Sequence, residues 1–354
     1  MGPGAAVAEV RNAVRACLAD LPAGQVVLVA CSGGADSLAL AAALAFVAPR
    51  AGLQGGGVTV DHGLQPGSAG RAAQVAAQLT VLGLDPVRSV AVTVAQPGQA
   101  GGLEAAARAA RYGALQDAAA GCGAAAVLLG HTLDDQAETV LLGLARGSGG
   151  RSLAGMPARR GCYRRPLLGV RRSATAAACA ELGLEPWHDP HNADYRFTRA
   201  RVRHQALPAL EAALGPGVAE ALARTAGQLR ADAECLDGLA FAESGQLRGT
   251  GSAGAGSAGA GSAGADAPAD GSDPVGLDVA GLAALPAAIR TRVLRDAAVR
   301  AGCPPGALAA GHIGQVEALV TAWRGQRWTD LPGGVRARRQ AGKVWFSSSG
   351  RDEG

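Results

Sequence analysis

Four short apolar runs, each followed by a segment with helical periodicity, place the strongest constraint on how this chain folds. The expected strands cover residues 26–30, 57–60, 87–94 and 125–129, and the expected helices cover 36–47, 68–82, 103–119 and 133–145. Continuous apolar strands that alternate with helices indicate a parallel sheet buried on both faces. We therefore predict an α/β fold built on a doubly wound parallel sheet, whose ligands bind at the carboxyl ends of the strands.

The second part of the chain has a different pattern. From Val202 it is mainly helical, with a break at residues 215–217, and the segment WTDLPGGVRARRQAGKVWF alternates like a small hairpin. We predict a first domain over residues 1–212 and a smaller, mainly helical domain over 213–354. Residues 251–265 repeat Gly-Ser-Ala-Gly-Ala three times and cannot bury a core, so we expect a disordered Gly/Ser/Ala-rich insert at 249–273.

Composition excludes several kinds of chemistry. The one lysine, Lys343, lies outside any Gly-Lys-Ser/Thr motif, which argues against a Walker-type phosphate loop and against a Schiff-base enzyme. The seven cysteines are scattered without a C-x-x-C pair, which argues against zinc and iron–sulfur sites and fits a reducing cytoplasm. The longest wholly apolar run, 38–48, is too short to span a bilayer. We expect a cytoplasmic protein with no membrane partner.

The sequence Ser32-Gly33-Gly34-Ala35-Asp36-Ser37 joins the first expected strand to the first expected helix. Two glycines allow a tight turn whose N–H groups point into one concavity, and the helix N-terminus and the serine hydroxyls add to it. Such a cradle suits a phosphate or pyrophosphate, and Asp36 fits it if Mg²⁺ lies between the carboxylate and the phosphates. The simpler alternative is a strand–turn–helix in which Asp36 caps the helix.

A second polar group follows the fourth expected strand. His131 ends that strand, and Thr132 with Asp135 has the spacing of a capping-box variant. Asp135 and Glu138 share one face of the following helix, whereas Asp134 points elsewhere. Two carboxylates at this edge can hold a metal ion or the ammonium groups of an amino substrate. The alternative is a capped helix with a solvated acidic start.

Positive charge is concentrated after this helix. The net charge is +4, and residues 146–172 hold eight arginines and no acid. Together with later arginines they predict a phosphate-binding stripe. The candidates are Arg146, Arg151, Arg164, Arg165, Arg199, Arg201 and Arg203. Nearly all positive charge in this chain is arginine, so ordinary solvated arginines are the alternative.

These motifs resemble known ones. Ser32–Ser37 is similar to the pyrophosphate-binding loop of the N-type ATP pyrophosphatases, the Rossmann-like PP-loop family. Within that family, residues 24–212 resemble the tRNA(Ile)-lysidine synthases. The matching segments are VDHGLQ, EAAARAARYGAL, HTLDDQAET, RPLLGVRR and WHDPHNADYRFTRARVRHQALPAL. At Gln65 the family usually has arginine, so the resemblance implies that one phosphate or backbone contact is missing here or supplied by another residue.

The resemblance implies a reaction and roles for residues. ATP adenylates the wobble cytidine of a tRNA(Ile) with a CAU anticodon, and free L-lysine then displaces AMP. ATP would be bound by Ser32, Gly33, Gly34, Ala35, Asp36, Ser37, Asp61 and His62, with Mg²⁺ on Asp36. Lysine would be held by Asp135 and Glu138, and the catalytic set would be Asp36, Arg111, His131, Asp135 and Glu138. The arginines above and the domain over 213–354 would bind the tRNA.

Two other functions stay open. One is another adenylating enzyme of the same loop family, such as a tRNA thiolase or an amidating synthetase; the lone cysteines and the lack of a glutaminase nucleophile weigh against it. The other is a nucleotide-binding regulatory module without catalysis, which would not need carboxylates beside an arginine-rich loop. The sequence also leaves the oligomeric state open, a homodimer included.

Overall fold

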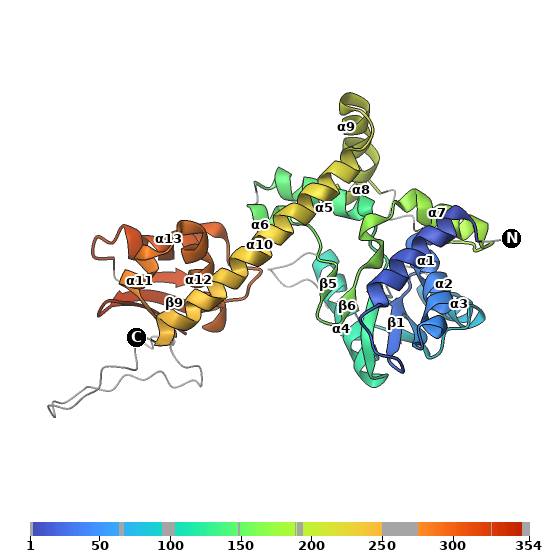
Figure 1. Ribbon diagram of the computed structural model, residues 1–354, viewed down its shortest axis with the longest axis horizontal. Helices are drawn as coiled ribbons and strands as arrows, with labels where there is room; N and C mark the ends of the chain where they lie inside the picture. The colour runs from blue at the N-terminus through green and yellow to red at the C-terminus, as the bar shows by residue number, and fades with distance from the viewer. Residues whose placement is uncertain are drawn as a thin grey trace. The chain divides into compact units, whose positions relative to one another are not determined.

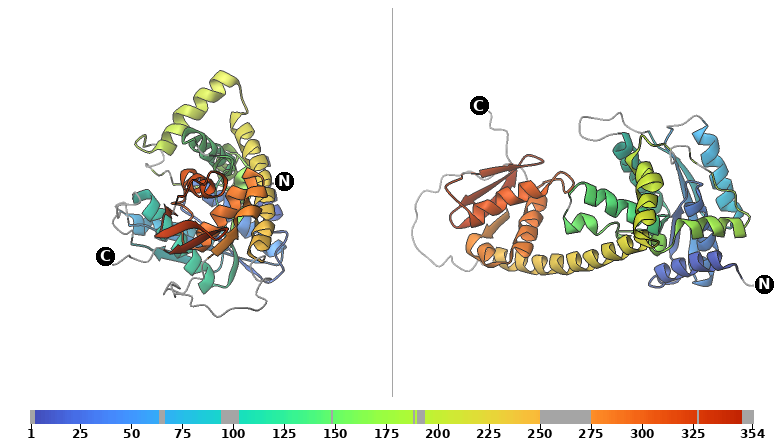
Figure 2. Two further views of the ribbon diagram at one scale, coloured as in Figure 1. Left: turned by 90° about the vertical axis from the view of Figure 1, so that its left-hand side faces the viewer. Right: turned by 90° about the horizontal axis from the view of Figure 1, so that it is seen from above.

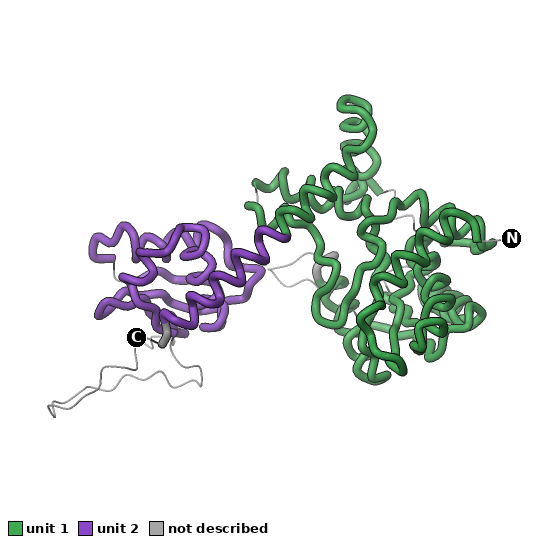
Figure 3. Tube along the Cα trace, viewed as in Figure 1, with its two compact units in different colours: residues 1–230 green, residues 231–354 purple. Residues whose placement is uncertain are grey.

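The computed structural model describes residues 3–63, 67–93, 103–147, 149–187, 189, 194–249, 275–326 and 328–348. The chain divides into two compact units, residues 1–230 (unit 1) and 231–354 (unit 2), coloured separately in Figure 3. The boundary lies inside helix α10 (Val218–Gly249). The insert expected at 249–273 lies, apart from Gly249, outside the described residues. Within the described ranges, no helix is long and apolar enough to cross a membrane.

A six-stranded sheet forms the centre of unit 1 and confirms the predicted α/β fold. Its order is β3-β2-β1-β4-β6-β5, and only the β5–β6 pair is antiparallel. The strands are β1 (Val26–Ala30), β2 (Gln54–Asp61), β3 (Val87–Ala91), β4 (Ala124–Leu129), β5 (Arg159–Arg160) and β6 (Tyr163–Arg164). The chain adds β2 and β3 on one side of β1 and then returns to add β4 on the other. Ligands of such sheets bind where the order reverses, at the carboxyl ends of β1 and β4.

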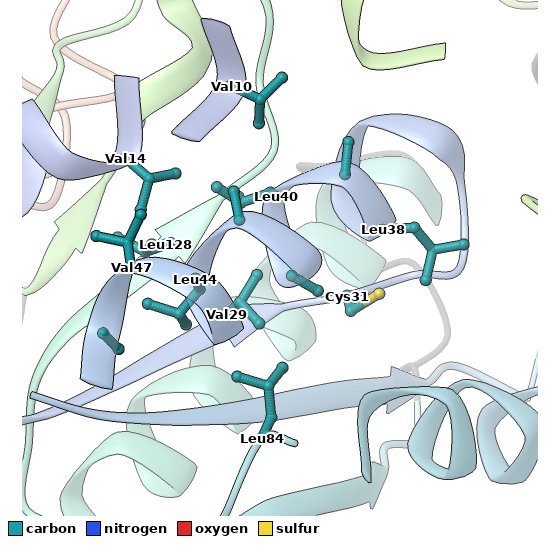
Figure 4. Close-up of a cluster of buried hydrophobic side chains, with 14 of the residues drawn as sticks. Val10, Val14, Val29, Cys31, Leu38, Leu40, Leu44, Val47, Leu84 and Leu128 are labelled. Carbon is teal, nitrogen blue, oxygen red and sulfur yellow. The ribbon is translucent and has the colours of Figure 1, made fainter. Parts of the chain in front are cut away.

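Helices cover both faces of this sheet (Figure 1). One face packs against α1 (Ala5–Leu18), α2 (Ala35–Arg50), α3 (Ser68–Val81) and α7 (Arg172–Glu181), and the other against α4 (Leu103–Gly121). Figure 4 shows valines and leucines of α1, α2 and β1 meeting in the first core. Helix α1 was not expected from the sequence, although its buried residues Val7, Val10, Val14 and Leu18 recur at helical spacing.

The rest of unit 1 is made of short helices. They are α5 (Leu133–Ala145), α6 (Gly150–Leu153), the 3₁₀ turn η1 (Pro166–Gly169), α8 (Thr198–Arg201), the π-helical turn η3 (Val202–Ala206) and α9 (Leu207–Leu214). The last three follow one another without a break until Gly215, whose φ of 93° ends the helix. This is the break that the sequence predicted before α10.

Unit 2 combines helices with a four-stranded antiparallel sheet of order β7-β10-β9-β8. The strands are β7 (Val275–Asp278), β8 (Trp328–Leu331), β9 (Val335–Gln340) and β10 (Lys343–Ser348), and the helices after α10 are α11 (Val279–Ala284), α12 (Ala287–Arg300) and α13 (Ala310–Thr321). Figure 2 shows the helices lying against the sheet. The predicted hairpin is β8–β9, and the rest of the sheet was not expected from the sequence. A second turn, in which Ala341 and Gly342 have positive φ, joins β9 to β10. Strand β7, which pairs with β10, lies more than fifty residues before it in the chain.

Candidate active site

The glycine turn after β1 is tight, as the predicted anion cradle requires. Gly33 has a φ of 84°, and a Cβ there would lie 2.8 Å from Val75 Cγ2, so only glycine fits. Ser37 Oγ accepts the Ser32 N–H at 3.2 Å and donates to the Gly34 carbonyl at 2.9 Å, which closes the turn onto α2. Gly34 is the N-cap residue and makes no side-chain cap. Asp36 therefore does not cap α2, and its carboxylate is available for another role.

Asp36 is held from α7. Its Oδ1 accepts the Thr175 hydroxyl and its Oδ2 accepts Arg172 Nε at 3.4 Å. Burial raises the pKa of Asp36, and the contacts with Thr175 and Arg172 partly offset this. The side chain keeps 25% of its surface exposed beside the glycine turn. A hard carboxylate oxygen at that place fits Mg²⁺ bound between a carboxylate and phosphates.

The second polar group begins α5 as predicted. Thr132 and Asp135 form a capping box, in which Asp135 Oδ2 accepts the Thr132 N–H at 2.8 Å. The other oxygen of Asp135 accepts Arg172 Nη2 at 2.9 Å. Burial would raise the pKa of Asp135, but Arg172, the Thr132 N–H and Arg203 lower it. Asp134 turns to the Arg172 N–H and the Arg171 side chain, so it lies apart from this group as expected.

Glu138 is fully buried and surrounded by guanidinium groups. It accepts Arg203 Nε at 2.7 Å and Arg172 Nη1 at 3.3 Å, and Arg199 Nε lies 3.2 Å from it. Three arginines thus face the three carboxylates of Asp36, Asp135 and Glu138, and the charges balance. Arg172 is not among the site residues predicted from the sequence. It lies more than thirty residues from these carboxylates in sequence, so no local spacing pointed to it.

His131 follows β4 and directly precedes Thr132, which caps α5. Its Nδ1 is buried and has no hydrogen-bond partner among the described residues. Burial lowers the pKa of His131 to about 4, so the ring is neutral at pH 7. An unpaired buried nitrogen at a polar edge is best explained by a ligand that satisfies it.

The end of β2 brings Asp61, His62 and Arg111 together. Asp61 Oδ1 accepts the Gly63 N–H at 2.9 Å, and that hydrogen bond lowers the pKa of Asp61. Arg111 Nε lies 3.4 Å from His62 Nε2. His62 Nδ1 is a second buried ring nitrogen without a partner in the described part of the chain. Gln65 lies outside the described residues.

The predicted tRNA-binding arginines fall into three environments. Arg146, Arg151 and Arg201 are exposed. Arg164 and Arg165 are buried: Arg164 pairs with Asp20 and donates to the Cys17 carbonyl at 2.6 Å, and Arg165 donates to the Pro157 carbonyl at 2.9 Å. Arg199 and Arg203 contact Glu138. The arginine run alone carried no sign of these differences, because the partners lie on distant elements.

The two motifs are in direct contact. Gly130, at the end of β4, lies so close to α2 that a Cβ there would be 3.2 Å from the backbone of Asp36 and Ser37. Arg172 then contacts the carboxylates of Asp36, Asp135 and Glu138. The glycine turn and the carboxylates of Asp135 and Glu138 therefore adjoin at the switch point of the sheet. This arrangement can join an ATP-activated group to an amine.

Comparisons with known proteins agree with this geometry. A PP-loop domain family matches residues 7–210, and the TilS substrate binding domain family matches residues 277–345. A tRNA(Ile)-lysidine synthase of Thermobifida fusca is 58% identical over 348 residues, 98% of this chain and 99% of that protein. One of Streptomyces coelicolor is 54% identical over 374 residues, 97% and 99% of the two chains.

Among solved structures, a U34-tRNA thiolase from Methanococcus maripaludis is similar to 63% of this chain and 79% of its own, with a TM-score of 0.54 and 18% identity. At that identity the likeness concerns the fold alone. The two family matches and the high identity over nearly the full length are decisive for the family. This chain belongs to the tRNA(Ile)-lysidine synthase family.

Proposed function

We propose that this chain is a ligase that uses ATP to form lysidine on tRNA(Ile). The wobble cytidine of the CAU anticodon attacks the α-phosphate of ATP, pyrophosphate leaves, and the lysine amine then displaces AMP. The observation that carries the proposal is the position of Arg172, which contacts Asp36 on one side and Asp135 and Glu138 on the other. Because one side chain reaches both motifs, the nucleotide and the amine would bind side by side.

The cradle is proposed to hold the pyrophosphate end of ATP. The N–H groups of Gly33, Gly34 and Ala35 and the hydroxyl of Ser32 would contact the phosphates, Ser37 would hold the turn closed, and Asp36 would hold Mg²⁺. When bound, the ion would neutralise charge on the phosphates. Asp61, His62, Arg111 and His131 would contact the nucleotide, since His62 and His131 each have a buried nitrogen that a ligand can satisfy. Arg111 can stabilise the charge that develops on the α-phosphate.

Asp135 and Glu138 are proposed to hold L-lysine, which carries two ammonium groups. Both carboxylates already accept guanidinium groups, so lysine must share or replace those contacts. ATP offers the arginines another anionic partner, so we infer that its phosphates draw guanidinium groups away and open the carboxylates. The attacking amine must also lose a proton. Neutral His131 and the Asp135 carboxylate are the groups of this site proposed to accept that proton.

The tRNA is proposed to lie along the exposed arginines Arg146, Arg151 and Arg201 and on unit 2. An anticodon loop is single-stranded, so its wobble base can leave the stack and enter the site. All seven cysteines are free thiols, which fits our proposal of a cytoplasmic location. The thiolase alternative is not favoured, because the full-length relatives described above are lysidine synthases.

The test is nucleoside mass analysis of a tRNA(Ile) transcript with a CAU anticodon, incubated with the protein, ATP, Mg²⁺ and lysine. We expect one cytidine to become a lysine adduct, and adenylated tRNA to accumulate when lysine is omitted. Asp36→Asn should abolish both products, whereas Asp117→Asn, an exposed carboxylate on α4, should leave both unchanged. Pyrophosphate release without any lysine adduct would point instead to another acceptor.

A further inference from the structure

The sheet of unit 2 packs one face against the helices of its core, and its other face is the outer face. Leu277, Val335, Ala337, Val344 and Phe346 are buried against the helices. Side chains alternate along a strand, so the residues between these point to the opposite face. That outer face therefore carries the polar and aromatic side chains of the strands.

Two tryptophans and an arginine form a row across this outer face. The strand register places Trp328 opposite Arg338, Arg338 opposite Trp345, and Trp345 opposite Gly276. Residues directly opposite in an antiparallel pair project from the same face. Trp328 is 45% exposed. The Trp345 ring packs on Gly276, where a Cβ would lie 2.6 Å from the ring. One face of the ring is therefore covered by the backbone of β7.

Positive charge surrounds this row. The Arg336 guanidinium lies 4.7 Å from the Trp328 ring centroid, and the Lys343 ammonium lies 5.6 Å from that of Trp345. Arg338 is exposed and has no side-chain partner in the part of the chain that the structure describes. The nearby acids are engaged: Asp330 pairs with Arg336 at 2.8 Å, and Asp278 accepts the Gly281 N–H to cap α11. Three cations (Arg336, Arg338 and Lys343) thus face two carboxylates (Asp330 and Asp278), so the outer face keeps a net positive charge.

Tryptophan rings on a protein surface are unfavourable in water unless they serve a function. The chain has only 4 tryptophans, 3 tyrosines and 4 phenylalanines, yet two of the tryptophans lie on the outer face of this sheet, Trp328 exposed and Trp345 half-buried. Aromatic rings on a sheet stack with unpaired bases, whose faces are free, and cations beside them hold the phosphates. A paired helix hides its base faces and offers no such contact.

We propose that this surface, defined by Trp328, Arg336, Arg338, Lys343 and Trp345 and named the Trp–Arg face, binds unpaired nucleotides of the tRNA. The rings of Trp328 and Trp345 stack with bases, and Arg338 and Lys343 contact phosphates. The inference rests on the proposed function only in taking tRNA as the substrate. It assigns the contact to one face of unit 2 and to single-stranded RNA.

The test compares Trp328→Leu with Trp323→Leu in the full-length protein. Trp323 is a matched control: it is 49% exposed and has Arg339 4.7 Å from its ring centroid, but Arg339 projects to the helix-covered side of the sheet. Dissociation constants are measured for the tRNA(Ile) transcript and for a single-stranded oligouridylate. Because each stacked base contributes to binding, the dissociation constant should rise roughly tenfold for Trp328→Leu and no more than about twofold for Trp323→Leu.

A second variant covers the case in which Trp328→Leu fails to fold. Arg338→Gln removes one exposed charge, and it should lower the salt dependence of tRNA binding by about one phosphate contact. Unchanged affinity in both variants, or equal binding of a blunt RNA duplex and the oligouridylate, would overturn the proposal. If wild type forms no lysidine but Trp328→Leu still weakens oligouridylate binding, the proposed function fails and the Trp–Arg face stands.

Discussion

Replacement of Glu138 by glutamine probes the balance of charge in the active site. Glu138 is fully buried and accepts hydrogen bonds from Arg172 and Arg203, with Arg199 at 3.2 Å. Removal of one partner from a buried ion pair costs about 3–5 kcal/mol. The three guanidinium groups are 21–37% exposed and can turn partly to water. We therefore expect Glu138→Gln to lower the free energy of unfolding by an amount near the lower end of this range, about 3 kcal/mol. For a unit of this size, that lowers Tm by about 6–12 °C.

Differential scanning calorimetry of the full-length protein measures this effect. The transition of unit 1 should move, whereas that of unit 2 should stay. The double variant Glu138→Gln/Arg203→Met leaves two arginines facing two carboxylates and should recover at least half of the loss. Asp330→Asn removes a carboxylate that is 65% exposed and should change stability by no more than about 0.5 kcal/mol. A Glu138→Gln protein that melts within about 2 °C of wild type would refute the reasoning.

Two further predictions concern the cradle and His131. Gly33→Ala places a Cβ at positive φ and 2.8 Å from Val75 Cγ2, so the KM for ATP in a pyrophosphate-release assay should rise several-fold. Gly113→Ala, on α4 with no atom within 4 Å of the new Cβ, should leave that KM unchanged, and equal values for both variants would contradict the cradle. The pKa of His131 is about 4 in the folded protein and about 6.5 when unfolded, so the unfolded chain binds the extra proton between these values. Stability should therefore fall as pH drops from 7 to 5, by about 2 kcal/mol from this residue. Urea midpoints of wild type and His131→Asn at both pH values measure it, and identical pH dependence would disprove it.

Much of unit 1 was predictable because its signals are local. Strands such as 26–30 and helices such as 133–145 match the observed bounds, since apolar periodicity and a capping box are properties of neighbouring residues. The sheet of unit 2 was harder to predict. Its strand β7 pairs with β10, which lies more than sixty residues later in the chain, and no short-range pattern specifies such a pairing.

The candidate site also combines features that are local in sequence with features that depend on distant residues. The glycine turn and the spacing of Asp135 and Glu138 are visible in the sequence, and so is the separate direction of Asp134. The use of each arginine is not visible, because it depends on which distant carboxylate the fold brings near. Arg164 and Arg203 look alike in sequence, yet one pairs with Asp20 and the other with Glu138.

The missing side chain at Gly130 has a consequence for how the reaction is aligned. Because a Cβ at Gly130 would lie only 3.2 Å from the backbone of Asp36 and Ser37, the residue after β4 approaches the start of α2 directly, with no side chain between them. The spacing between the glycine turn and the start of α5 is therefore set by the packing of the backbone. In the proposed reaction, ATP and lysine would therefore bind to neighbouring backbone segments of one fold, and the anticodon base is the component that would have to move into position.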